Sequence, residues 1–357
     1  MTTLMRRSLM MTAIVGLAGS LAVQADGTSD RDPQTAGYEE TATRLLHTGL
    51  RELGAYGSLE RILSVGPRQT GSPQADQAVS LMVEHMKALG FDNVRTEPTV
   101  VGHWVRGTVE EGAIVSKTQG RIPVKVRAIG NSIATPPGGL TAGIVEVRSF
   151  EELEKIGDRA RGKIVFFNGA MDPTTIDTFP AYGGAARQRS GGAVAAARVG
   201  GVAAVVRSLT LQINDDPHTG TMSYDPAVAK IPAVNISTAA SDMLSGMLRH
   251  EPDLQFSFRT SSETLAPVTS HNVMGEIRGS EHPEEVIVIG GHLDSWDLSA
   301  GAHDDGSGCA QSIEALRLIR ELGLKPKRTI RAVLYMDEEN GGAGGRDQQH
   351  GQSEHRQ

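Results

Sequence analysis

The sequence has little cysteine, few aromatic side chains and no excess of basic charge, and these shortages narrow its range of functions. The single cysteine, Cys309, excludes an intramolecular disulfide framework. Aromatic residues make up only 4% of the chain. The formal net charge is −7, so no basic surface for nucleic acid or an anionic membrane is expected. The sequence also contains no HExxH helix, no GxSxG elbow and no phosphate-binding glycine loop.

The first 25 residues predict an export signal. Arg6 and Arg7 precede an apolar stretch at 9–23, and a small-residue pattern ends at Ala25. A run of about 15 apolar residues is short for a membrane span, which needs about 20. We therefore expect cleavage near Ala25 and an exported protein, periplasmic or extracellular, with no membrane attachment after cleavage. Both the general and the twin-arginine export routes stay open.

The rest of this 357-residue chain is long enough for two domains of helices and strands. Apolar residues at helical spacing predict helices within 39–63 and over 74–89. Between 131 and 265, predicted strands and helices alternate and have a core of their own. The apolar segment 191–206 predicts a helix, a tight turn and a strand rather than a membrane span, because it contains Arg198 and a glycine pair.

The most informative stretch runs from residue 286 to residue 305. It begins with an aliphatic run at 286–289, which predicts a strand buried on both faces of a parallel sheet. A glycine pair follows, and then His292, Asp294 and Asp297. Polar side chains at the carboxyl end of a buried strand stand where open α/β sheets place their active sites.

Two more groups of carboxylates follow in the same region. Asp304 and Asp305 precede a predicted helix at 307–322, and the next predicted strand, 329–335, is followed by the acidic run 337–339. A strand–helix–strand crossover makes its two strands parallel, so their carboxyl ends lie at one edge of the sheet. We therefore expect the histidine and the two groups of acids to gather there.

These residue types suit a zinc site with a pair of ions. His292 offers an imidazole nitrogen, and Asp304 offers a carboxylate that can bridge two ions. Asp294 is expected to hold the imidazole in place. Of Glu338 and Glu339, one is expected to bind metal and the other to take a proton from a metal-activated water.

Two other groups are expected to be structural. Glu284 and Glu285 follow His282 and a proline, which predicts a solvated turn before a strand. Cys309 lies among small residues at the start of a predicted helix, and no histidine-centred triad is evident. We therefore expect a packed thiol rather than a nucleophile.

Several motifs of the chain carry a family resemblance. The site motifs are GGHLDSWD, GAHDDGSG and DEENGG, and they are accompanied by GPRQTGSP and HWVRG. Together they resemble the M28 metallopeptidases, in particular the carboxypeptidase Q group, over about 66–345. The segments ARGKIVFFN, DDPHTG and KIPAVNIS are similar to an inserted protease-associated domain. The resemblance implies an α/β fold of the zinc-peptidase type, with a three-layer α/β/α catalytic domain and an inserted β/α domain.

The resemblance also implies a role for each candidate residue. His292 would bind one zinc ion, Asp304 would bridge two ions, and Glu339 would bind the second. Glu338 would act as general base, and Asp294 would orient His292. The implied activity is aminopeptidase or carboxypeptidase Q-like removal of amino acids from small peptides with a free amino end, by a protein that forms homodimers.

The resemblance suggests a division of the chain after the signal. Residues 26–130 would form the first part of the peptidase domain, 131–265 the inserted protease-associated domain, 266–345 the catalytic core and 346–357 a polar tail outside the family.

The tail departs from the family pattern. It contains no aliphatic or aromatic side chain, so no further buried strand is expected from it. The family's two remaining zinc ligands, an aspartate and a histidine, have no matching position, and Asp347, His350 and His355 are expected to belong to the polar tail. We therefore expect a C-terminally incomplete peptidase with three of five ligands, explained by a premature stop or frameshift near Arg346. A non-catalytic peptide-binding protein and a non-functional gene fragment stay open as alternatives.

Overall fold

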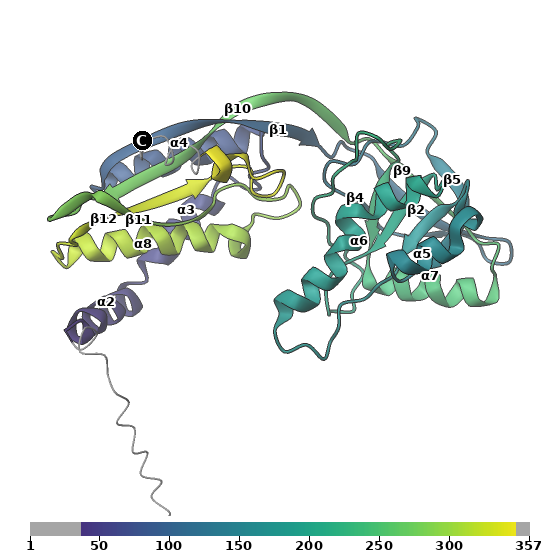
Figure 1. Ribbon diagram of the computed structural model, residues 1–357, viewed down its shortest axis with the longest axis horizontal. Coiled ribbons are helices and arrows are strands. Elements are labelled where there is room, and N and C mark those ends of the chain that lie inside the picture. Colours follow the sequence, from purple (N-terminus) through teal and green to yellow (C-terminus); the bar gives the residue numbers. More distant parts are fainter. Residues whose placement is uncertain (1–36, 348–357) are drawn as a thin grey trace, which may run out of the picture. The chain divides into compact units, whose positions relative to one another are not determined.

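The structure is a computed structural model that describes residues 37–347 (Figure 1). The predicted signal, 1–25, and two tail residues, His350 and His355, lie outside the described residues. The chain divides into a unit Met1–Leu46 and a unit His47–Gln357, and both sheets belong to the second of these.

The first sheet carries the predicted site. Its described strands lie in the order β1–β10–β12–β11. Their bounds are β1 (Asp92–Val105), β10 (Glu263–Ile277), β11 (His282–His292) and β12 (Arg328–Tyr335). Strands β11 and β12 are parallel, with His292 beside Tyr335 at their carboxyl ends, and the other two pairs are antiparallel. The prediction that two acid-bearing strand ends share one edge of a sheet is confirmed.

Strand β11 is not buried on both faces, so that prediction was wrong. Within the described residues it is an edge strand that pairs only with β12, and Val286 and Ile287 are 38% and 49% exposed. A short aliphatic run indicates a strand but carries no information on how many neighbours the strand has.

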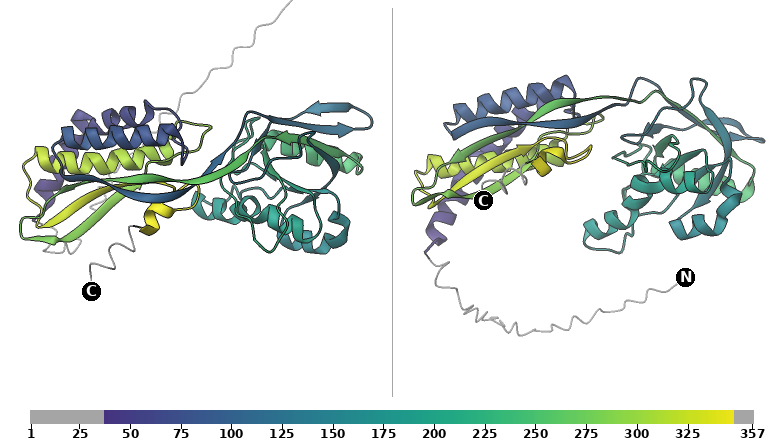
Figure 2. Two further views of the ribbon diagram at one scale, coloured as in Figure 1. Left: turned by 90° about the horizontal axis from the view of Figure 1, so that it is seen from above. Right: turned by 45° about the horizontal axis from the view of Figure 1, so that its top comes forward.

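Helices cover one face of the first sheet (Figure 2). Helix α4 packs on β1 and β10, helix α8 packs on β10, β11 and β12, and α3 packs on both helices. The bounds are α2 (Glu39–Glu52), α3 (Gly54–Leu63), α4 (Pro73–Ala88) and α8 (Ser307–Glu321). These helices confirm the predicted helical segments. Since α3, α4 and α8 lie on the same face, the described residues supply two of the three layers that the family resemblance implies.

Local signals fix the helix ends. The Ser72 side chain caps α4 by accepting a hydrogen bond from the backbone N–H of Ala75, and Pro73 occupies the first turn. Helix α8 ends at Glu321 and is followed by Gly323, whose φ of +64° suits glycine. Between the helices and the sheet lies an apolar core that includes Met82, Met86 and Leu316.

The second sheet has eight strands in the order β3–β2–β9–β5–β6–β7–β8–β4. Their bounds are β2 (Glu110–Ser116), β3 (Gly120–Pro123), β4 (Val126–Ala128), β5 (Leu140–Val147), β6 (Ile164–Phe167), β7 (Ala203–Arg207), β8 (Ala233–Ile236) and β9 (Gln255–Thr260). The helices of this region are α5 (Phe150–Ile156), η1 (Gly157–Ala160), α6 (Thr178–Arg198) and α7 (Thr238–His250). Helix α6, a turn and β7 confirm the prediction for 191–206. Among the helices of residues 37–347, none combines the length and the apolar character that a bilayer span requires.

The second sheet starts earlier in the chain than an inserted domain at 131–265 would. Strands β2, β3 and β4 precede residue 131 and pair within this sheet, with β2 beside β9. Strand pairing therefore joins 110–128 to the second sheet. The division into domains itself stays a prediction.

Candidate active site

The predicted metal ligands meet at the carboxyl edge of the first sheet. His292 is the last residue of β11, Asp304 lies in the turn η2 (Ala302–Gly306) before α8, and Glu339 follows β12. One ligand atom from each lies within 4.8 Å of the others. The closest pair is His292 Nε2 and Asp304 Oδ1, at 2.9 Å. Glu338 joins the group, with a carboxylate oxygen 3.8 Å from His292 Nε2.

Asp294 contacts both the histidine and the two glutamates. Its main-chain oxygen lies 3.0 Å from His292 Nδ1, whereas its carboxylate lies 3.7 Å from that nitrogen. The fully buried carboxylate accepts hydrogen bonds from the backbone N–H groups of Glu338 and Glu339, both at 3.2 Å. It therefore fixes the turn that carries both glutamates, in addition to lying beside the imidazole.

Two residues of the loop before α4 hold the site in place, and the sequence analysis missed them. Thr70 donates from its hydroxyl to Asp294 Oδ2 at 2.8 Å. Arg68 is fully buried, and its guanidinium donates to the carbonyl oxygens of Leu293 at 2.7 Å and Gly301 at 3.1 Å. The available signal was the motif GPRQTGSP, whose polar residues occupy a loop with no amphipathic pattern to explain them.

Asp305 joins the histidine strand to the start of α8. Its carboxylate accepts hydrogen bonds from the backbone N–H groups of His292 at 3.0 Å and Gly308 at 2.9 Å. The thiol of Cys309 is buried beside it and donates to the main-chain oxygen of His292 at 3.1 Å. Its buried position confirms the prediction of a packed thiol, and burial raises the pKa of that thiol.

Two other acids, Asp297 and Asp347, form contacts outside the cluster. Asp297 makes a bidentate ion pair with the buried guanidinium of Arg106, at 2.7 and 2.8 Å. Asp347 accepts a hydrogen bond from the Thr99 hydroxyl at 2.6 Å. Neither belongs to the groups of metal-ligand atoms that the described residues form.

The electrostatics of the site follow from crowded carboxylates. Burial acts to lower the pKa of His292, but Asp294 and Asp304 outweigh it and raise that pKa to about 11. The hydrogen bond to His292 lowers the pKa of Asp304. Burial, followed by the charge of Asp304, raises the pKa of Glu339 to about 8, and burial raises the pKa of Glu338. Buried carboxylates that repel one another favour a bound cation, because a nearby positive charge stabilises their ionised form.

The donor set fits zinc. Zinc in proteins takes imidazole nitrogen and carboxylate oxygen, and one nitrogen and two carboxylate groups converge here. His292, Asp304 and Glu339 can therefore hold a metal ion, and Glu338 lies beside them.

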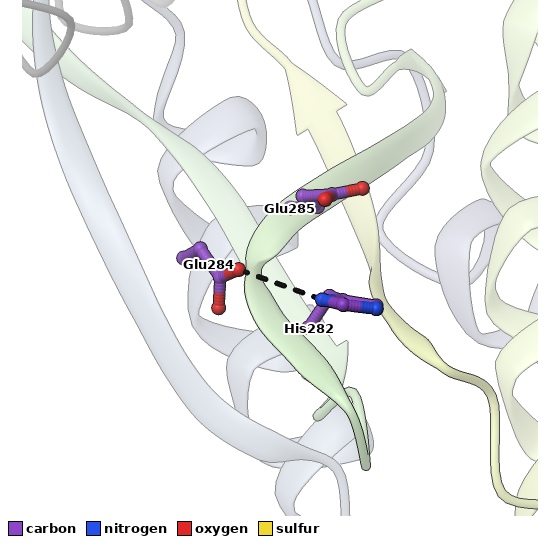
Figure 3. A group of neighbouring side chains, drawn as sticks. All are labelled: His282, Glu284 and Glu285. Atoms are coloured by element: carbon purple, nitrogen blue, oxygen red, sulfur yellow. Dashed lines mark ion pairs between the residues drawn. The ribbon is translucent and has the colours of Figure 1, made fainter.

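A second group of ligand-type side chains consists of His282, Glu284 and Glu285 (Figure 3). All three are exposed, and His282 Nδ1 lies 3.9 Å from a Glu284 oxygen. Glu285 forms an ion pair with Arg328. These contacts are those of exposed charged residues at the start of β11, and we assign no site to them.

A pocket of about 600 Å³ opens at the acidic cluster. Asp304, Glu338 and Glu339 line it, together with residues of α6 such as Tyr182 and Arg189. Its volume lies in the range of small-molecule sites in proteins, about 300–1,000 Å³.

Comparison with known proteins assigns the chain to a family. Residues 272–356 match the sequence model of Peptidase family M28. Carboxypeptidase Q from Bos taurus is 36% identical over 345 residues, which cover 93% of this chain and 70% of that protein. The chain belongs to peptidase family M28. This M28 peptidase is therefore an enzyme of the peptide-hydrolysing class, and its family match extends past Gly345, where the sequence analysis ended the resemblance.

Solved structures agree with this assignment. The structure of a peptidase M28 precursor from Shewanella amazonensis SB2B is 38% identical, with a TM-score of 0.82 over 86% of this chain and 69% of that one. BSAP, a zinc aminopeptidase from Bacillus subtilis, is 20% identical, with a TM-score of 0.58 over 83% of this chain and 64% of that one. At 20% identity, the second comparison shows a shared fold only. The predicted α/β class is confirmed.

Proposed function

We propose that this M28 peptidase is a zinc-dependent exopeptidase that removes amino acids from small peptides with a free amino end. The observation that carries the proposal is the convergence of His292, Asp304 and Glu339 within 4.8 Å at one sheet edge. We propose that two zinc ions would be held here by His292, Asp304 and Glu339, with Asp304 as the ligand that both ions would share. Bound zinc would supply Lewis-acid polarisation of the scissile carbonyl and would lower the pKa of an attacking water.

In this proposal Glu338 is the general base. Its side chain is 61% exposed, so it is accessible from the pocket, and it lies 3.8 Å from His292. Partial burial raises its pKa above the ordinary value of a glutamate, which favours a carboxylate that accepts a proton during the reaction. The buried Asp294 carboxylate positions Glu338 through the backbone N–H bond at 3.2 Å.

The remaining expectations concern the setting of the enzyme. We propose that it is exported to the periplasm or the extracellular space, on the basis of the predicted signal at 1–25. We also propose that it forms homodimers and that 131–265 contains an inserted protease-associated domain. The family resemblance supports both.

Purified protein tests the function directly. We expect bound zinc by mass spectrometry and hydrolysis of leucine-containing dipeptides that a chelator abolishes. His292→Ala should lose zinc and activity, whereas His282→Ala, a matched histidine in the exposed group of Figure 3, should keep both. A stable protein that binds peptides, but binds no zinc and does not hydrolyse the peptides, would support the non-catalytic alternative. Aggregation would support the gene fragment.

A further inference from the structure

One cation lines the same pocket as the acidic cluster. Arg189 of α6 borders the pocket that Asp304, Glu338 and Glu339 also line. Within the part of the chain that the structure describes, its hydrogen-bond acceptors are neutral: the main-chain oxygen of Thr219 at 3.3 Å and the Tyr182 hydroxyl at 2.5 Å. Its Nε is buried and has no partner there. The charge of Arg189 is therefore not matched by an acid of the described chain.

The guanidinium is held in a fixed position without an ion pair. It lies over the Tyr182 ring, 5.4 Å from the ring centroid. Gly220 permits its approach, since a Cβ at that position would lie 2.3 Å from the Arg189 Cζ. A charge that is already oriented loses little entropy when it binds a ligand.

Tyr182 adds a second donor at this end of the pocket. Its hydroxyl oxygen accepts from Arg189, so the hydroxyl proton stays available for a ligand. An arginine beside a hydroxyl donor suits a carboxylate, which accepts several charge-assisted hydrogen bonds. The adjoining Phe179 is 83% exposed and also lines the pocket, which offers apolar contact next to the two donors.

We infer that Arg189 and Tyr182 bind the free α-carboxylate of a short peptide whose amino end lies at the acidic side of the same pocket. The inference rests on the proposed exopeptidase function and specifies its substrate class. A pocket of about 600 Å³ that is lined both by acids of the sheet edge and by an arginine of α6 matches a zwitterionic di- or tripeptide. Phe179 favours an apolar side chain on the residue that carries the carboxylate.

The test compares an apolar dipeptide with its C-terminal amide, which removes the negative charge at nearly the same size. Wild-type enzyme should prefer the free acid by about tenfold or more in kcat/KM, because the amide cannot form the charge-assisted hydrogen bond with Arg189. Arg189→Gln should remove this preference and Tyr182→Phe should reduce it. Arg187→Gln is the matched control: it lies on the same helix, stacks 5.7 Å from the Phe150 ring and lines a different pocket, so the preference should persist.

Equal rates on acid and amide in the wild type, or an unchanged preference in Arg189→Gln, would overturn the inference while leaving the peptidase function intact. Absence of all hydrolysis would overturn the proposed function instead. In that case calorimetric binding of the same two ligands to chelator-treated protein decides the inference. Tighter binding of the acid that Arg189→Gln abolishes supports it, and equal or absent binding contradicts it.

Discussion

Glu338 and Glu339 are adjacent in the chain, yet their surroundings differ. The Glu338 side chain is 61% exposed and lies 3.8 Å from His292, whereas Glu339 is part of the ligand group and its pKa rises to about 8 through burial and the charge of Asp304. Both backbone N–H groups are bound by the Asp294 carboxylate. The anchored turn thus leaves the Glu338 side chain accessible and places Glu339 among the candidate metal ligands.

Glu338→Gln should therefore abolish proton transfer while it leaves the metal site intact. We expect kcat to fall by roughly 10²–10⁴-fold, the usual contribution of a positioned general base, with zinc content unchanged. Glu339→Gln serves as the comparison and should lower zinc content. Stopped assays together with metal analysis check both variants. A Glu338→Gln enzyme with wild-type kcat would remove Glu338 from the mechanism.

Thr70 is expected to matter through Asp294. Thr70→Val keeps the shape of the side chain but removes the hydroxyl that donates to the buried Asp294 carboxylate at 2.8 Å. Hydrogen bonds to charged groups contribute about 1.5–3 kcal/mol, so the free energy of unfolding should fall by about that amount. We also expect kcat to fall, because the turn with both glutamates loosens. Thr70→Ser should restore both quantities, and urea titrations with steady-state kinetics measure them. If Val and Ser variants behave alike, the hydroxyl is not what positions the turn.

At the scale of elements, the contact between α3 and α4 contains a partly buried histidine. His85 Nε2 lies 3.0 Å from the Ser58 hydroxyl, and burial, followed by the charge of Arg61, lowers the pKa of His85 below 6.5. The unfolded chain therefore binds a proton at a higher pH than the folded protein does. The free energy of unfolding should fall as pH drops from about 6.5 through the lowered folded-state pKa, and His85 should have no effect above that window.

His85→Gln should remove this part of the acid sensitivity and keep a side chain that can bond to Ser58. Urea unfolding at pH 7.5 and at pH 5 measures the change for both proteins. An identical loss of stability in wild type and variant would show that other groups control the acid response.

Elements with a one-sided apolar pattern were predictable from sequence, and those without it were not. Helix α4 buries Met82 and Met86 at helical spacing, which the sequence displays directly. The first half of strand β10 gives no such signal, because most of it is exposed and lacks an apolar pattern. That half is defined by backbone pairing with β1, which depends on a partner far away in the chain.

At the scale of the whole molecule, the same limit applies to the site. His292, Asp304 and Glu339 follow or precede strongly patterned elements, so the βαβ rule alone predicts that they meet. Thr70 lies 224 positions from its partner Asp294, and no local pattern connects the two. Candidate ligands near strand ends can thus be predicted from the sequence. The residues that position those ligands cannot, because their contacts form only in the tertiary structure.

Zinc should stabilise the protein as a whole, because the ligands converge only when β11, η2 and the segment after β12 are folded together. An ion that binds the folded state alone raises the free energy of unfolding by about 2.7 kcal/mol at a hundredfold excess over its Kd. We therefore expect a higher Tm on addition of zinc to chelator-treated protein, measured by scanning fluorimetry. His292→Ala should lose this shift and His282→Ala should keep it. Loss of the shift in His282→Ala but not in His292→Ala would place the stabilising ion at the exposed group at the start of β11 and contradict the proposed metal centre.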